Sequence, residues 1–178
     1  MNTGDKNYFY WAFESRNDPA NDPVVLWHTG GPGCSGMLAL VVENGPCHLS
    51  DDGMTSSLNP YSWNNNATLI YIDQPTGTGF SYGTDYDHNE TEVGDDMYDF
   101  LQQWLDAHDD LRDNDFYVFG ESYGGQYDFI IFLHVKYNHL KTTRSPPPQL
   151  RSSCHASCLA RKSGLCQQED PVEGSRGR

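Results

Sequence analysis

Short apolar runs alternate with helix-like stretches along the first three quarters of the chain. The run at 24–27 is bounded by Asp22-Pro23 and by a glycine-rich loop, and similar runs lie at 68–72 and 116–119. Runs of this length rich in β-branched and aromatic residues predict buried strands, and the aromatic run at 8–13 predicts another.

Three segments predict helices between or after these strands. Residues 35–43 predict a helix that stops at 44–46 (Asn-Gly-Pro), and a later helix is expected to start at Ser122. In the middle segment the apolar residues are spaced as one helical face: Val93, Met97, Phe100, Leu101, Trp104 and Leu105. Strands alternating with crossover helices predict an α/β class, with a parallel sheet covered by helices on both faces.

The composition of the chain changes near residue 137. Residues 1–136 hold four Lys/Arg and 22 Asp/Glu, a balance of −18, whereas residues 137–178 hold seven and three, a balance of +4. From Lys141 onward no helical or strand period survives. We therefore predict one folded part at 1–136 and a disordered tail at 137–178.

Charge and hydropathy exclude several classes of partner. The net charge of −14 over 178 residues argues against nucleic acid and anionic membrane. No apolar run approaches transmembrane length, and Met1 is not followed by a signal region, so this chain as written is expected to start in the cytosol. Asn66 and Asn89 nevertheless begin glycosylation sequons, which matter only in a secreted protein. Composition does not determine the oligomeric state.

The segment Gly120-Glu121-Ser122-Tyr123-Gly124 has the G-x-S-x-G pattern of a nucleophile elbow. Such a turn lies between a strand and a helix and pushes the serine hydroxyl outward. A serine nucleophile also needs two donors for the oxyanion of its intermediate. The N–H of Tyr123 and the glycine-rich loop at 29–33 are the candidates for these donors.

Four blocks in order resemble the serine carboxypeptidase family, most closely its plant-type branch. They are residues 22–35 (DPVVLWHTGGPGCS), 43–46 (ENGP), 73–82 (DQPTGTGFSY) and 120–125 (GESYGG). The likeness covers roughly Tyr8 to Tyr127. It implies an α/β-hydrolase fold, a vacuolar, lysosomal or extracellular location in the secretory pathway, and removal of C-terminal residues from peptides at acidic pH. It implies no cofactor and no metal.

The resemblance also implies roles for individual residues. Ser122 matches the nucleophile, and Gly31 and Tyr123 match the donors of the oxyanion hole. Four positions match those that hold the terminal carboxylate of the substrate: Trp27, Gly30, Glu43 and Glu121. Two adjacent carboxyl groups cannot both ionise easily, so one keeps a proton that it can donate to that carboxylate.

The chain departs from the family pattern at several positions. Thr29 stands where Asn is expected, His28 where an apolar residue is usual, and Gln126 where His is usual. A threonine hydroxyl can still donate one hydrogen bond. After Tyr127 the likeness ends, beginning at Asp128.

The Asp and His of the family's triad lie well over a hundred residues beyond the serine, and only 56 residues follow Ser122. His134 lies about 18 Å along the predicted helix, on the wrong side for a base, and His139 and His155 lie in the tail. The sequence thus predicts a hydrolase fold truncated after the elbow, an open sheet edge there, and little or no turnover by this chain alone.

The cysteine count agrees with this expectation. The five cysteines are Cys34, Cys47, Cys154, Cys158 and Cys166, and an odd number leaves at least one unpaired. The resemblance pairs Cys34 with a distant downstream cysteine, which we expect to be absent. A zinc site at Cys154, His155, Cys158 and Cys166 is not favoured, because the spacing is not that of a metal knuckle.

Three functions therefore remain open. The first is a serine carboxypeptidase acting through an acyl-enzyme on Ser122, which we favour for the lineage of the chain. The second is a carboxypeptidase-like acyltransferase that passes the acyl group to an alcohol, and the pair Glu43 and Glu121 argues for peptides instead. The third is a non-catalytic fragment that binds a partner or has no role.

Overall fold

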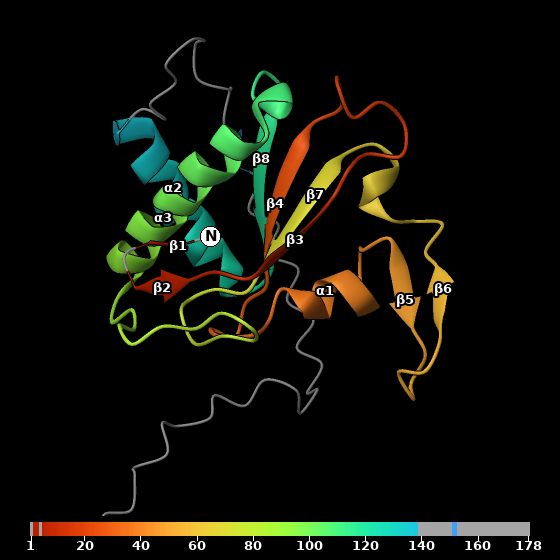
Figure 1. The fold of residues 1–178 in the computed structure, drawn as a ribbon, viewed down its shortest axis with the longest axis horizontal. Helices are drawn as coiled ribbons and strands as arrows, with labels where there is room; N and C mark the ends of the chain where they lie inside the picture. Colours follow the sequence, from red (N-terminus) through yellow and green to blue (C-terminus); the bar gives the residue numbers. More distant parts are fainter. Residues whose placement is uncertain (1, 4, 139–150, 153–178) are drawn as a thin grey trace, which may run out of the picture.

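The computed structural model describes residues 2–3, 5–138 and 151–152 and is organised around a five-stranded sheet (Figure 1). The strand order is β3-β7-β4-β8-β9, in which β3 is antiparallel to β7 and the other neighbours are parallel. The strands are β3 (Tyr10–Phe13), β4 (Val24–His28), β7 (Thr68–Ile72), β8 (Phe116–Gly120) and β9 (Arg151–Ser152). The strands predicted at 24–27, 68–72 and 116–119 are confirmed.

Helices cover both faces of the sheet, as the alternation predicts (Figure 1). Helix α1 (Met37–Val42) packs on one face, and α2 (Glu90–Ala107) and α3 (Gly124–Asn138) pack together on the other. Alternate residues of β4 point to opposite faces, so Val25 joins the core under α1 and Leu26 joins the core under α2 and α3. The α/β class is therefore confirmed.

Shorter elements frame this sheet. Two antiparallel ribbons are formed by β1 (Asn2–Thr3) with β2 (Lys6–Asn7), and by β5 (Cys47–Leu49) with β6 (Ser56–Leu58). Two 3₁₀ turns are η1 (Trp63–Asn65) and η2 (Asp109–Leu111). The ribbon of β5 and β6 lies beside α1, on the side of the sheet away from α2 and α3 (Figure 1).

The start and the orientation of helix α2 are explained by its capping residues and its apolar face. The Asn89 side chain accepts hydrogen bonds from the N–H groups of Thr91 and Glu92, and Glu92 reaches back to the N–H of His88. This reciprocal capping satisfies N–H groups that a helix start leaves without partners. All six residues of the predicted apolar face are buried.

Two expectations about the end of the folded part need correction. The third helix begins at Gly124 instead of Ser122, because the elbow turn uses Ser122 itself. The edge of β8 is not fully open, since Tyr117 and Val118 pair in parallel with Arg151 and Ser152. The rest of the predicted disordered tail lies outside the described residues.

Candidate active site

Ser122 lies at the tip of a sharp turn between β8 and α3. Its φ of +54° makes it the one non-glycine residue with positive φ in the described part of the chain. The turn is closed by a 2.8 Å hydrogen bond from the N–H of Gly124 to the carbonyl of Glu121, and Ser122 itself is exposed. A left-handed serine between a strand and a helix is the strained geometry that presents a nucleophile to a substrate.

Close approach of the strand ends explains the glycines around this turn. A Cβ at Gly124 would lie 2.4 Å from the carbonyl oxygen of His28 at the end of β4. A Cβ at Gly30 would lie 2.6 Å from the carbonyl oxygen of Glu121 and 2.8 Å from the nitrogen of Tyr123. The glycine-rich loop after β4 therefore packs directly against the elbow.

This contact brings together the two predicted oxyanion donors. The backbone at Gly30 lies against the nitrogen of Tyr123, and Gly31 is the next residue in the loop. Within the described residues neither N–H donates a backbone hydrogen bond, so both are free to bind an anion. Paired free N–H groups beside a serine are the donor arrangement that stabilises a tetrahedral oxyanion.

The predicted carboxylate-binding residues gather on the α1 face of the same turn. Glu43 caps the C-terminal end of α1, and Glu121 comes from the elbow. Although Glu43 lies at the surface, desolvation of its carboxyl group, and secondarily the charge of Glu121, raise its pKa above the ordinary 4.5. Desolvation and a neighbouring negative charge both favour the protonated form of the Glu43 carboxyl group.

Trp27 and Thr29 complete this side of the site. Thr29 is buried. Its hydroxyl oxygen accepts a 3.2 Å hydrogen bond from the indole N–H of Trp27. Because the Thr29 oxygen accepts this bond, its own O–H remains free to donate. The Trp27 ring also meets Trp63 edge-on at 5.3 Å, which fixes the plane of the indole.

The buried residue Asp73 links several loops around the site through hydrogen bonds. The sequence analysis placed Asp73 in the block at 73–82 and gave it no role. One oxygen of Asp73 accepts hydrogen bonds from the Ser35 hydroxyl and the Gly36 N–H, at 2.5 and 2.9 Å. Its other oxygen accepts from the N–H of Phe80 at 2.9 Å. Asp73 thus connects the start of α1 to the loop that follows β7.

A second buried pair lies beneath the elbow. Nδ1 of His28, at the end of β4, is 2.9 Å from Oδ1 of Asp128 in α3, and both side chains are fully buried. Sequence reasoning noted both residues as departures from the family and gave Asp128 no role. The signal it missed was that two ionisable residues stand at positions that β4 and α3 bring together.

No base for Ser122 is found in the described part of the chain. None of the described side chains hydrogen-bonds to its hydroxyl, and the imidazole of His28 is already engaged with Asp128. His134 lies in α3, as expected. His139 and His155 lie outside the described residues.

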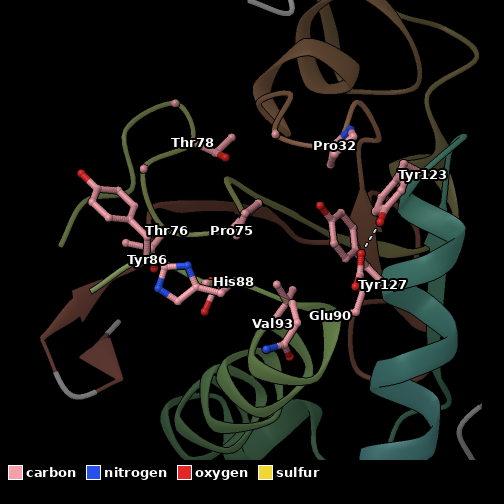
Figure 2. Close-up of a pocket in the computed structure, with 15 residues that line it drawn as sticks. Pro32, Pro75, Thr76, Thr78, Tyr86, His88, Glu90, Val93, Tyr123 and Tyr127 are labelled. Atoms are coloured by element: carbon pink, nitrogen blue, oxygen red, sulfur yellow. Dashed lines mark hydrogen bonds between the residues drawn. The ribbon is translucent and has the colours of Figure 1, made fainter. Parts of the chain in front are cut away.

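A cleft of about 750 Å³ opens beside Tyr123, and Glu43 is not among its lining residues (Figure 2). Its walls include Pro32 from the glycine-rich loop after β4, Tyr123 from the elbow and Tyr127 from α3. The start of α2 supplies Glu90, which accepts a hydrogen bond from the Tyr123 hydroxyl (Figure 2). Sequence reasoning did not predict this cleft, because its walls come from four separate segments.

The cysteines differ in state. Cys34 is disulfide-bonded and Cys47 is a free, exposed thiol, so the partner of Cys34 lies outside the described residues. The odd count predicted at least one unpaired cysteine, and Cys47 is one. The residues considered for zinc (Cys154, His155, Cys158 and Cys166) are not among those described. Within residues 2–3, 5–138 and 151–152, no group of three potential metal ligands occurs and no helix is long and apolar enough to span a bilayer.

A serine on a strand–helix elbow, in an α/β sheet with two free N–H groups beside it, is the arrangement typical of the α/β-hydrolase fold class. The serine carboxypeptidase family matches residues 1–153, and the chain belongs to that family. A vacuolar serine-type carboxypeptidase of Saccharomyces cerevisiae is 52% identical over 122 residues, which are 68% of this chain and 24% of that protein. A serine carboxypeptidase-like protein of Oryza sativa is 51% identical over 130 residues, covering 71% of this chain and 30% of that protein.

A solved structure extends the likeness to the fold. The prohormone-processing carboxypeptidase Kex1 of Saccharomyces cerevisiae superposes with a TM-score of 0.75 at 31% identity, over 85% of this chain and 34% of that one. The α/β-hydrolase fold is thereby confirmed. The chain spans about a quarter of the length of the first curated relatives it matches.

Proposed function

We propose that Ser122 is the nucleophile of a serine carboxypeptidase, which releases C-terminal residues from peptides. The observation that carries this proposal is the glutamate pair Glu43 and Glu121 beside the elbow. A hydrolase for esters or amides in general needs only the serine, its base and the oxyanion hole. A site that also offers a protonated carboxyl group fits a substrate that ends in a free carboxylate.

The roles of the residues follow from their positions. The Ser122 oxygen would attack the carbonyl carbon of the last peptide bond and lose its proton to a base. The N–H groups of Gly31 and Tyr123 would hold the oxyanion that forms. The base would pass this proton to the leaving nitrogen as the C–N bond breaks, which releases the terminal amino acid and leaves an ester on Ser122. Water would then hydrolyse the ester and regenerate the serine.

The terminal carboxylate would lie on the α1 face of the elbow. Protonated Glu43 would donate a hydrogen bond to it, Thr29 would donate through its hydroxyl, and the backbone at Gly30 would approach it closely. Trp27 would form the wall of this subsite. Binding a carboxylate next to two acids requires the shared proton, which is why the site suits an acidic compartment.

For this chain alone we propose little or no turnover. The support is that the described residues hold no imidazole in hydrogen-bond contact with Ser122. A serine without a base is a weak nucleophile. Carboxylate recognition does not depend on the base, so this chain is still expected to bind peptides that end in a free acid.

The acyltransferase alternative uses the same Ser122 ester and differs only in its acceptor. We rank it second, because its substrates need no terminal carboxylate and Glu43 with Glu121 would then have no function.

We also propose passage through the secretory pathway to a vacuole, lysosome or the exterior. Asn66 and Asn89, the two sequon asparagines, are both exposed and accessible for glycosylation.

Titration calorimetry with a blocked dipeptide tests the proposal. The free acid of acetyl-Phe-Leu is expected to bind this chain at least about tenfold more tightly than its C-terminal amide at acidic pH. The proposal is wrong if acid and amide bind alike, or if a glucose ester displaces the dipeptide with higher affinity. In a cleavage assay, Ser122→Ala is expected to leave the rate unchanged. A clear loss of activity in Ser122→Ala would show that this chain contains its own base.

A further inference from the structure

The cleft beside Tyr123 has no part in the reaction described above. It reaches from the oxyanion loop at Pro32 to the start of α2 at Glu90, with Tyr123, the neighbour of Ser122, forming one wall (Figure 2). The glutamates of the carboxylate subsite do not line it. The cleft is therefore separate from the carboxylate subsite, and its wall at Tyr123 is the residue that follows Ser122 in the chain.

The two subsites lie on opposite faces of the sheet. Glu43 caps the end of α1 and Glu90 begins α2, and these two helices lie on opposite faces of the sheet (Figure 1). Ser122 follows directly after the end of β8. A peptide with its carboxylate at Glu43 and its scissile carbonyl at Ser122 must continue away from α1. The residue on the acyl side of the scissile bond is thus directed toward the cleft.

The walls of the cleft combine aromatic rings with negative charge. Tyr86, Tyr123 and Tyr127 line it together with Val93, and these surfaces suit the methylene stem of a long side chain. Its titratable groups besides the tyrosines are Asp87, His88 and Glu90. No lysine or arginine is among the lining residues.

The two carboxylates of the cleft differ in availability. Asp87 is engaged by the Lys6 ammonium at 2.5 Å and by the Tyr8 hydroxyl at 3.3 Å. Glu90 accepts a hydrogen bond from the Tyr123 hydroxyl, which lowers the pKa of Glu90 below its ordinary value. The Tyr123 hydroxyl engages Oε1 of Glu90, so Oε2 can accept a hydrogen bond from a ligand.

We propose that this cleft binds the acyl-side residue of the substrate and selects a basic side chain through Glu90. Lysine or arginine would lay its stem along Tyr123 and Tyr127 and place its charge at the Glu90 carboxylate. The inference rests on the proposed carboxypeptidase function, because the direction of the peptide is set by the carboxylate subsite. The inference adds a preference for peptides with lysine or arginine on the acyl side of the scissile bond. Neither Ser122 nor the pair Glu43 and Glu121 determines this preference.

The test compares two tripeptides that differ in one charge. Acetyl-Ala-Lys-Ala and acetyl-Ala-norleucine-Ala have the same terminal residue and similar stems, and their affinities for the full chain are measured by calorimetry. The lysine peptide is expected to bind about tenfold more tightly at low salt. Glu90→Gln should abolish this preference while leaving the affinity for the norleucine peptide within about twofold.

Glu92→Gln is the matched control, since Glu92 lies in the same helical turn, contacts His88 and Asn89, and does not line the cleft. This variant should keep the preference for lysine. The inference is overturned if Glu90→Gln keeps the preference, if both variants lose it equally, or if a phenylalanine peptide binds more tightly than the lysine peptide.

A further peptide separates failure of the inference from failure of the proposed function. The C-terminal amide of the norleucine peptide should bind more weakly than its free acid. Equal binding of acid and amide overturns the carboxylate subsite, whereas a retained preference for the acid without a preference for lysine overturns only the cleft. If no peptide binds, both proposals are wrong.

Discussion

At the scale of single residues, the geometry at Ser122 depends on backbone approaches that only glycine permits. The carbonyl oxygen of His28 occupies the space that a Cβ at Gly124 would need, at 2.4 Å. An added methyl group there must push β4 and α3 apart, and the elbow lies between them. The residue type at 124 therefore fixes the position of the serine as well as the packing of the helix.

Gly124→Ala is expected to destabilise the fold by about 1–3 kcal/mol, because overpacking at a backbone contact forces a shift of main chain. Urea unfolding followed by tryptophan fluorescence measures the change. Gly53→Ala is the control, since Gly53 has a φ of +67° and open space around its Cβ position, so it tests the left-handed conformation without a clash. A loss at Gly124 no larger than that at Gly53 would contradict the packing argument.

The carboxyl group of Glu43 makes a pH-dependent prediction. Desolvation and the charge of Glu121 raise the pKa of Glu43, so it holds its proton to a higher pH than a free glutamic acid and loses it as the pH rises further. The affinity for a peptide free acid should accordingly be highest in acid and fall as the pH rises from about 4 to about 7.

Glu43→Gln carries an amide that donates a hydrogen bond at every pH. Its affinity for the same peptide should therefore vary much less over this range than that of the unaltered chain. Calorimetric titrations at several pH values provide the measurement. The assignment fails if the unaltered chain binds with the same affinity throughout, or if the variant keeps the full pH dependence.

At the scale of elements, β4 and α3 are joined by a polar contact in an otherwise apolar layer. His28 and Asp128 are each fully buried, and among the described residues Nε2 of His28 and Oδ2 of Asp128 have no hydrogen-bond partner. A buried pair of this kind stabilises the fold little more than apolar side chains of similar size would. Removing one partner is nevertheless costly in folding free energy, because the other polar group is left buried without a hydrogen bond.

A double-mutant cycle tests this coupling. His28→Leu and Asp128→Val should each cost about 3–5 kcal/mol of unfolding free energy, while the double variant should recover most of that loss. The surface pair Arg112 and Asp106, at 2.6 Å with Asp106 largely exposed, is the control and should cost about 1 kcal/mol or less when broken. If the two single losses simply add in the double variant, the residues are not coupled.

The same contact shows where sequence reasoning reaches its limit. Periodicity found β4, β7, β8 and the buried face of α2, because local patterns decide these elements. The family motifs placed Ser122 and Gly31 within the elbow and its neighbouring loop. The pairing of His28 with Asp128 joins residues a hundred positions apart and leaves no local pattern. The two-residue strand β9 is too short to produce one.

At the scale of the whole molecule, the described part of the chain is strongly acidic. Residues 1–136 hold 22 acidic and four basic residues. One of the four, Lys6, is buried between Asp87 and Asp96, with N–O distances of 2.5 and 2.8 Å. Most of the remaining carboxylates face solvent and other carboxylates, so long-range repulsion acts on the folded state.

Screening should therefore stabilise the protein. Raising NaCl from about 0.05 to about 0.5 M at neutral pH is expected to raise the melting temperature, by about 2–4 °C for each kcal/mol of repulsion removed. Calorimetry at both salt concentrations measures the shift. The effect should shrink near pH 4.6, the isoelectric point of the sequence, where the net charge vanishes. A melting temperature that falls with salt at neutral pH would mean that attractive pairs such as Lys6 with Asp87 outweigh the repulsion, and the stability of the fold would then depend on a few specific ion pairs.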